Sequence, residues 1–98
     1  MSMETNQAYD LLPSRDHVLG EVTQIAAEFS NMAPDQVRED HTLLGDLAWD
    51  SLDVVEFTME IEEHFGITVP DELVEHARTV GDVAEGVLVL LGRRTPDS

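Results

Sequence analysis

The 98-residue chain has no cysteine, few basic residues and no long hydrophobic run. Without thiols, the chain cannot form disulfides or thiolate zinc sites, and it has no cysteine that could act as a nucleophile. Its longest aliphatic run, VLVLL at 87–91, is too short to cross a bilayer, which takes about 20 apolar residues. The N-terminal stretch MSMETNQAYD lacks the basic and apolar regions of a secretory signal, so we expect a cytoplasmic protein without membrane insertion.

The scarcity of basic residues leaves a strongly acidic chain. Five basic residues are set against 21 acidic ones, which gives a formal net charge of −16. Such a surface repels phosphate backbones and anionic lipid headgroups, so we expect no nucleic-acid or membrane partner. It attracts basic protein surfaces instead. Because 42% of the residues are hydrophobic and fall at regular spacings, the chain is predicted to fold rather than to remain disordered.

The length allows one small domain. We expect a flexible N-terminal segment at residues 1–13, a folded domain at 14–92 and a polar C-terminal tail at 93–98, because apolar residues recur regularly only in the central part. Their spacing is helical, so the predicted fold is all-α: a small four-helix bundle with three longer helices and one short helix. A long loop at 30–50 joins the first helix to the second.

The first helix is predicted over residues 15–29, with Ser14 as its N-cap. Its apolar stripe consists of Val18, Val22, Ile25 and Phe29. The long loop that follows also carries apolar side chains, which we expect to pack against the domain rather than extend into solvent. These side chains are Val37, Leu43, Leu44, Leu47 and Trp49.

The second helix is predicted to begin at Asp50 or Ser51 and to end at Phe65, before Gly66. At about 100° per residue it has two apolar faces. The core face consists of Val54, Phe57, Ile61 and Phe65. The opposite face consists of Leu52, Val55 and Met59, flanked by Glu56, Glu62 and Glu63. Because a small bundle buries one stripe, we expect this second face to be an exposed docking site for a basic, partly apolar partner. The alternative is scattered surface hydrophobes without a role.

Two further helices complete the predicted bundle. Asp71 is expected to cap a short helix that runs to about Ala77. Thr79 and Asp82 resemble a capping box for a last helix that ends before Gly92. The apolar side chains of that helix are Val83, Val87, Leu90 and Leu91.

Ser51 has two possible local roles. It could cap the second helix, but Asp50 can take that position and leave the Ser51 hydroxyl facing solvent. It could be a hydrolase nucleophile, but the sequence has no G-x-S-x-G turn, and no motif places one of the histidines at 17, 41, 64 and 76 beside it. Metal-binding motifs are also missing from the sequence. We therefore expect no catalytic residue and no metal site.

The segment DHTLLGDLAWDSLDVVEFTMEIEEHFGITVPDE, residues 40–72, resembles the centre of the acyl carrier proteins, especially the free-standing type. The resemblance covers about residues 14–92, so this part is expected to be an acyl carrier domain. It implies that Ser51, beside Asp50, receives a phosphopantetheine arm from coenzyme A through a phosphopantetheinyl transferase. The terminal thiol of the arm would hold an acyl group as a thioester. A thiol supplied by the prosthetic group would also explain the absence of cysteine.

The resemblance further implies a surface that partner enzymes recognise. The residues that match it are Leu52, Asp53, Val55, Glu56, Met59, Glu62 and Glu63. Phe57, Ile61 and Phe65 match core positions near which the family shelters its acyl chain. Ala48 departs from the family pattern, which has glycine two residues before the aspartate. Because alanine adopts φ > 0 only at a cost, we expect the loop before Ser51 to follow a different path.

The predicted function is that of a non-catalytic, monomeric carrier. It would deliver acyl intermediates to enzymes of fatty-acid, lipid or related biosynthesis through their basic docking surfaces. The alternatives are an aminoacyl or polyketide carrier of the same fold, an acidic interaction module that is never modified, and an acidic Ca²⁺ buffer.

Overall fold

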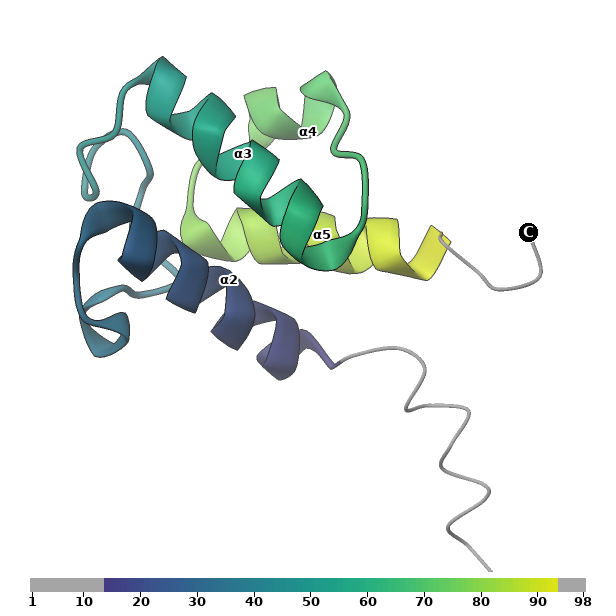
Figure 1. Cartoon of the computed structure of the whole chain (residues 1–98), viewed down its shortest axis with the longest axis horizontal. Helices are drawn as coiled ribbons and strands as arrows, with labels where there is room; N and C mark the ends of the chain where they lie inside the picture. Colours follow the sequence, from purple (N-terminus) through teal and green to yellow (C-terminus); the bar gives the residue numbers. More distant parts are fainter. Residues whose placement is uncertain (1–13, 94–98) are drawn as a thin grey trace, which may run out of the picture.

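A computed structural model describes residues 14–93 of the chain (Figure 1). Within this range the elements are α2 (Arg15–Ser30), the 3-10 helix η1 (Pro34–Gln36), α3 (Ser51–Phe65), α4 (Asp71–His76) and α5 (Val80–Arg93). Three longer helices, one short helix and a long loop between α2 and α3 confirm the predicted all-α bundle. The predicted N-terminal segment 1–13 and residues 94–98 of the predicted tail lie outside the described residues.

Helix α2 begins where the sequence predicts and ends one residue later than predicted, at Ser30. The Ser14 side chain accepts a hydrogen bond from the backbone N–H of His17 at 3.1 Å, and Asn31 ends the helix in the left-handed conformation at φ 61°. The buried residues of α2 are Val18, Val22, Ala26 and Ala27. Ile25 and Phe29 are only partly buried at the edge of the core. Two alanines therefore replace them at the centre of the contact surface, which lets the neighbouring helices approach closely.

The core joins three of the helices and the long loop. Helix α2 packs most extensively against α5 and also contacts α3, while α4 packs on α3. The buried residues outside α2 are Val37, Leu43 and Trp49 from the loop, Phe57 and Ile61 from α3, Ile67 after α3, and Val80, Ala84 and Val87 from α5. The loop thus supplies buried side chains to the core, as predicted.

Leu44 is the exception among the predicted loop residues, because its side chain is 63% exposed. The backbone N–H of Leu43 donates to the carbonyl of Arg78 at 2.9 Å, which directs the Leu43 side chain into the core. Leu44 follows within the turn at 43–46, which leaves its side chain at the surface. The expectation that Leu44 packs inward is therefore wrong.

The long loop is fastened to the start of α5 by backbone hydrogen bonds. Thr42 and Thr79 form an isolated antiparallel bridge. The N–H of Val80 donates to the His41 carbonyl at 3.1 Å, and the N–H of Gly81 donates to the Glu39 carbonyl at 2.8 Å. Because these bonds run from residue 39 to residue 43, they hold the loop along the end of the bundle that carries the N-terminus of α3.

The sequence misplaces two helix boundaries. The carbonyl of Pro70 accepts hydrogen bonds from the N–H groups of Leu73 and Val74, so Pro70 is the N-cap of α4 and Asp71 is its first helical residue. Asp71 therefore does not cap the helix. Helix α5 continues through Gly92 to Arg93, because a glycine weakens a helix without removing a backbone donor.

The predicted capping box of α5 is present. The N–H of Asp82 donates to the Thr79 hydroxyl at 3.1 Å, and the N–H of Thr79 donates to the Asp82 carboxylate at 3.2 Å. The same carboxylate accepts the N–H of Arg78 at 3.0 Å. These three bonds fix the backbone where α4 is connected to α5.

Candidate functional site

Two aspartates cap the N-terminus of α3 reciprocally. The N–H of Asp53 donates to the Asp50 carboxylate at 2.9 Å, and the N–H of Asp50 donates to the Asp53 carboxylate at 3.1 Å. Asp50 has extended backbone angles, φ −97° and ψ −177°, and is the N-cap of the helix. Of the two candidates for this position, Asp50 is therefore the cap, and Ser51 is the first helical residue.

Ser51 is exposed, and its hydroxyl has no hydrogen-bond partner among the described residues. Of the serines at 14, 30 and 51 in this part of the chain, it alone has an unengaged side chain. Ser14 accepts from the N–H of His17, and Ser30 accepts from the indole N–H of Trp49. The Ser51 oxygen is therefore available for chemistry without the loss of a structural bond.

The residue two positions before Ser51 anchors the site to the core. Trp49 is 6% exposed, and its indole N–H donates to the Ser30 hydroxyl at 2.9 Å. Its ring centroid lies 5.1 Å from the ring centroid of Phe29 and 4.8 Å from that of Phe57. Aromatic pairs in this range stabilise beyond their buried area. The N-terminus of α3 is thus tied to α2 and to the core through one side chain.

Ala48 adopts the left-handed conformation, with φ 58°. Alanine therefore takes a positive φ of the kind that glycine permits, and the expectation of a different loop path has no support at this residue. Two structural contacts overcome the local preference. Both are made by Trp49, the residue after Ala48. Its N–H donates to the Leu43 carbonyl at 3.0 Å, and its indole is buried. The left-handed conformation costs alanine about 1–2 kcal/mol.

A tight turn precedes Ala48 and is organised by Asp46. The N–H of Thr42 donates to the Asp46 carboxylate at 2.9 Å, and the N–H of Asp46 donates to the Thr42 hydroxyl at 2.8 Å. A Cβ at Gly45 would lie 2.6 Å from that hydroxyl oxygen, so a side chain there would displace the Thr42 hydroxyl that holds the turn. The backbone hydrogen bond from Thr42 lowers the pKa of Asp46. The bond to the Asp46 carboxylate therefore stabilises the folded chain at neutral pH. This contribution is lost when acid protonates Asp46.

The second apolar face of α3 is exposed, as the sequence analysis predicts. The exposed fractions are 64% for Leu52, 49% for Val55 and 56% for Met59. Leu44 adds a fourth exposed large hydrophobic residue from the loop. We call Leu52, Val55 and Met59 the α3 strip. The core face lies on the other side, where Phe57 and Ile61 are each 1% exposed.

The carboxylates predicted to flank the α3 strip fall into two groups. Glu56 and Glu63 are exposed, and their side chains make no hydrogen bond or ion pair within the described residues. Asp53 belongs to the capping box, and the Glu62 carboxylate accepts the N–H of Val69 at 2.8 Å. Asp53 and Glu62 therefore have structural roles that a surface pattern alone does not reveal.

A pocket of about 570 Å³ opens beside Ser51. Its lining residues come from the loop, from α3, and from α4 with the segment after it: Thr42, Leu43, Leu44, Ser51, Val54, Val55, Val74, Glu75, Ala77 and Arg78. Most of these side chains are apolar. Sequence reasoning missed the contribution of α4, because no local signal shows that Val74 and Ala77 face the N-terminus of α3.

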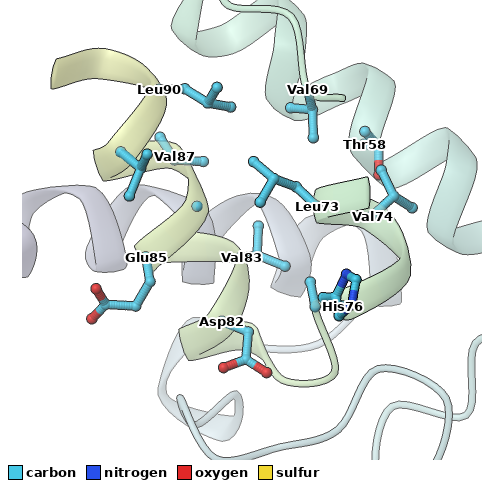
Figure 2. Close-up of a pocket in the computed structure, with 13 residues that line it drawn as sticks. Thr58, Val69, Leu73, Val74, His76, Asp82, Val83, Glu85, Val87 and Leu90 are labelled. Carbon is cyan, nitrogen blue, oxygen red and sulfur yellow. The ribbon is translucent and has the colours of Figure 1, made fainter. Parts of the chain in front are cut away.

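A second pocket, of about 300 Å³, lies between α4 and α5 with Thr58 of α3 at its edge (Figure 2). Leu73, Val83 and Leu90 point toward its interior in Figure 2, while the carboxylates of Asp82 and Glu85 point away. Val74 and Ala77 line both pockets. Two apolar spaces thus adjoin α4, and one of them opens at Ser51.

The histidines are engaged elsewhere. His17 and His64 each contact the Glu21 carboxylate, at 2.7 Å and 2.6 Å, and His41 accepts the N–H of Arg38 at 3.0 Å. His76 is hydrogen-bonded to the carbonyl of Glu72 at 2.7 Å. Among residues 14–93, no cluster of three or more histidine, aspartate or glutamate side chains could hold a metal ion. The helices in this range are also too short or too polar to cross a membrane.

Comparison with known proteins identifies the arrangement. A family described as "Phosphopantetheine attachment site" matches residues 20–87. The acyl carrier protein of Sulfurovum sp. is 47% identical over 62 residues, which cover 63% of this chain and 83% of that protein. The acyl carrier protein of Phenylobacterium zucineum is 41% identical over 75 residues, covering 76% of this chain and 95% of that protein. The chain belongs to the acyl carrier protein family.

A solved structure agrees with this assignment. The acyl carrier protein from Enterococcus faecalis matches with a TM-score of 0.66 and 32% identity, covering 80% of this chain and 99% of that chain. The prosthetic group of this carrier family is covalently attached phosphopantetheine. Two features of the structure fit such a group: the free hydroxyl of Ser51 and the apolar pocket that opens next to it.

The strain at Ala48 leads to a prediction about stability. Ala48→Gly should raise the free energy of unfolding by about 0.5–1 kcal/mol, because relief of about 1–2 kcal/mol of left-handed strain exceeds the 0.4–1 kcal/mol entropic cost of glycine. Urea unfolding followed by circular dichroism measures this change. Ala33→Gly is the matched control, since Ala33 is exposed and has φ −74°. It should lower stability. A loss of stability in Ala48→Gly equal to that in Ala33→Gly would show that residue 48 carries no strain.

Proposed function

We propose that Ser51 is the attachment site of the phosphopantetheine arm and that this chain is a non-catalytic acyl carrier. The observation that carries the proposal is the free, exposed hydroxyl of Ser51 at the first turn of α3, beside a capping residue that makes it unnecessary for the helix. In the attachment reaction, the Ser51 oxygen would bond to the pantetheine phosphorus of coenzyme A and displace the adenosine bisphosphate. The attached group supplies a thiol that holds an acyl group as a thioester.

The surroundings of Ser51 favour transfer by a separate enzyme over self-catalysis. Ser51 has no histidine or other base as a partner among the described residues, so this part of the chain does not activate the hydroxyl. A transferase must therefore supply the base and bind coenzyme A. The exposure of Ser51 at the end of the bundle gives such an enzyme direct access.

The cargo we propose is an acyl chain of fatty-acid or related lipid biosynthesis. The pocket beside Ser51 is lined mainly by aliphatic side chains, among them Leu43, Val54 and Val74. Burial of an apolar chain there is favourable by up to about 0.8 kcal/mol per methylene. This apolar lining favours an acyl cargo over an aminoacyl one, which would bring a charged amine. The core residues Phe57, Ile61 and Phe65, beside which the chain was expected, line neither of the two apolar pockets.

Partner enzymes would dock on the α3 strip. Leu52, Val55 and Met59 supply apolar contact area next to Ser51, while Glu56 and Glu63 are free to pair with basic partner side chains. Charges at the rim of an interface act mainly on the association rate and on orientation. Asp53 and Glu62 also lie at this surface, although their carboxylates are engaged within the carrier.

The attachment site is tested by intact mass. Incubation of the purified chain with coenzyme A and a broad-specificity phosphopantetheinyl transferase should add one phosphopantetheine, and Ser51→Ala should block the addition completely. Ser51→Ala should fold normally, since its hydroxyl makes no bond within the described part of the chain. Modification that persists in Ser51→Ala would disprove the assignment. A wild-type chain that stays unmodified would favour an acidic interaction module instead.

The docking surface is tested by charge reversal. Glu56→Lys should lower kcat/KM of the transferase for the carrier about 3- to 10-fold at low salt, because it repels a basic partner surface. The deficit should shrink as salt shortens the Debye length. Met59→Ala should slow the same reaction without this salt dependence, since it removes contact area rather than charge.

The matched control for Glu56→Lys is Asp35→Lys. Asp35 is exposed on η1, which packs on α2. Its substitution by lysine changes the net charge by the same amount as Glu56→Lys. Glu39 is unsuitable as a control because its carboxylate pairs with Arg15 at 2.9 Å. Asp35→Lys should change kcat/KM less than 2-fold, as expected for a charge outside the interface. Equal losses from the two reversals would mean that only the total negative charge matters, and the α3 strip would be rejected as a docking site.

A further inference from the structure

Arg78 lies between α4 and α5 with its backbone fixed on both sides. Its carbonyl accepts the N–H of Leu43 at 2.9 Å, and its N–H donates to the Asp82 carboxylate at 3.0 Å. The first bond ties Arg78 to the loop that leads to Ser51, and the second ties it to the first turn of α5. The backbone from which the Arg78 side chain extends is therefore fixed by the fold, while the residue itself is exposed.

The guanidinium of Arg78 lacks an acidic partner among residues 14–92, although the chain has 21 acidic residues and only five basic ones. The other arginines with described side chains are paired. Arg15 bonds to both Glu39 and Glu85, and the Arg38 guanidinium lies 3.4 Å from the Asp40 carboxylate. An unpaired cation is thus the exception on this surface.

Arg78 and Ser51 line the same pocket of about 570 Å³. Arg78 is the only basic residue among the lining residues, and Glu75 is the only acidic one. The other walls are apolar except for Thr42 and Ser51 itself. An anion attached to Ser51 would therefore find a single cation within this pocket.

The N-terminus of α3 is an unfavourable place for a phosphodiester in the absence of a cation. Asp50 and Asp53 flank Ser51 in the sequence, and their carboxylates at this helix end repel an added negative charge. The capping box also occupies the N–H of Asp53, one of the donors that a helix N-terminus would otherwise offer to phosphate. The helix end alone is therefore a weak anion site.

We propose that Arg78 binds the phosphodiester of the phosphopantetheine arm and holds the arm at the mouth of the pocket. This inference rests on the proposed attachment at Ser51. The planar guanidinium offers two parallel N–H donors that match two phosphate oxygens, so the contact has a defined orientation as well as opposite charge. Arg78 is then a positioning residue. It directs the arm toward the apolar pocket while the carrier is free, and a basic partner surface that competes for the same phosphate releases the arm.

The experiment compares the apo and holo forms of the full chain by nuclear magnetic resonance. The holo form is made with coenzyme A and a broad-specificity transferase, and intact mass verifies the addition before any spectrum is recorded. In ¹H–¹⁵N spectra, the Nε–Hε resonance of Arg78, assigned by its loss in Arg78→Gln, should shift between apo and holo protein. That of Arg38, which is exposed and lies outside the pocket, should not shift.

A ³¹P spectrum gives an independent readout, because the arm carries a single phosphorus. The phosphorus resonance of holo Arg78→Gln should differ from that of the wild type, whereas holo Arg38→Gln should match the wild type. The difference should shrink at 1 M salt, where the Debye length is about 3 Å. Arg78→Lys should give an intermediate position, since it keeps the charge but loses the paired donors.

The outcomes separate this inference from the proposed function. If the arm is attached at Ser51 but neither the Arg78 resonance nor the phosphorus resonance changes, Arg78 does not bind the phosphodiester, and the attachment site stands. If the wild-type chain gains no mass, or gains it at another residue, the proposed attachment and the role of Arg78 both fail. Equal effects of Arg78→Gln and Arg38→Gln would reduce the contact to general electrostatics and overturn it.

Discussion

The reciprocal hydrogen bonds between Asp50 and Asp53 are the constraint on which the candidate site depends. A helix that begins at a serine usually engages that serine as its cap. Here Asp50 satisfies the helix donor at Asp53, and Asp53 returns the bond to the backbone of Asp50. Ser51 is thereby displaced into the first turn with its oxygen unengaged. The acidic residues around the serine thus contribute to the architecture before any partner binds.

The segment before Ser51 keeps this arrangement rigid at a local cost. The buried indole of Trp49 and its bond to Ser30 fix the approach to α3, and Ala48 is held at φ 58° as a result. A small domain tolerates such strain only where neighbouring contacts offset it. The same loop is also hydrogen-bonded to the start of α5. It therefore connects the pocket beside Ser51 to the capping box of Asp50 and Asp53.

Local rules predicted much of this fold. Helical periodicity gave the buried Phe57 and Ile61 and the exposed Leu52 and Met59, and capping preferences gave the starts of α2, α3 and α5. Local rules misplaced the cap of α4 and the end of α5, and they also missed contacts between residues distant in the sequence. Leu44 is exposed in a turn whose first residue, Leu43, is buried and bonds to the distant Arg78 carbonyl. Glu62, predicted as a docking residue, also accepts a hydrogen bond from the Val69 backbone seven residues away, which the surface pattern does not reveal.

The pocket and Arg78 could not be predicted for a similar reason. They depend on how α4 sits against the loop and α3, and no repeat or motif in the sequence encodes that packing. The roles proposed for Ser51 and for the α3 strip, in contrast, follow from a short motif and from periodicity on one helix. The acidic composition alone does not distinguish carboxylates that build the fold from those that stay free for a partner. Only the hydrogen bonds of the folded chain do.

The central claim is that Asp50 caps α3 so that Ser51 is structurally dispensable. Urea unfolding of the apo-protein tests it directly through the two neighbouring variants Asp50→Ala and Ser51→Ala. Loss of the cap should lower the free energy of unfolding by about 0.5–2 kcal/mol in Asp50→Ala, while Ser51→Ala should stay within about 0.5 kcal/mol of the wild type. A loss in Ser51→Ala as large as that in Asp50→Ala would contradict the account.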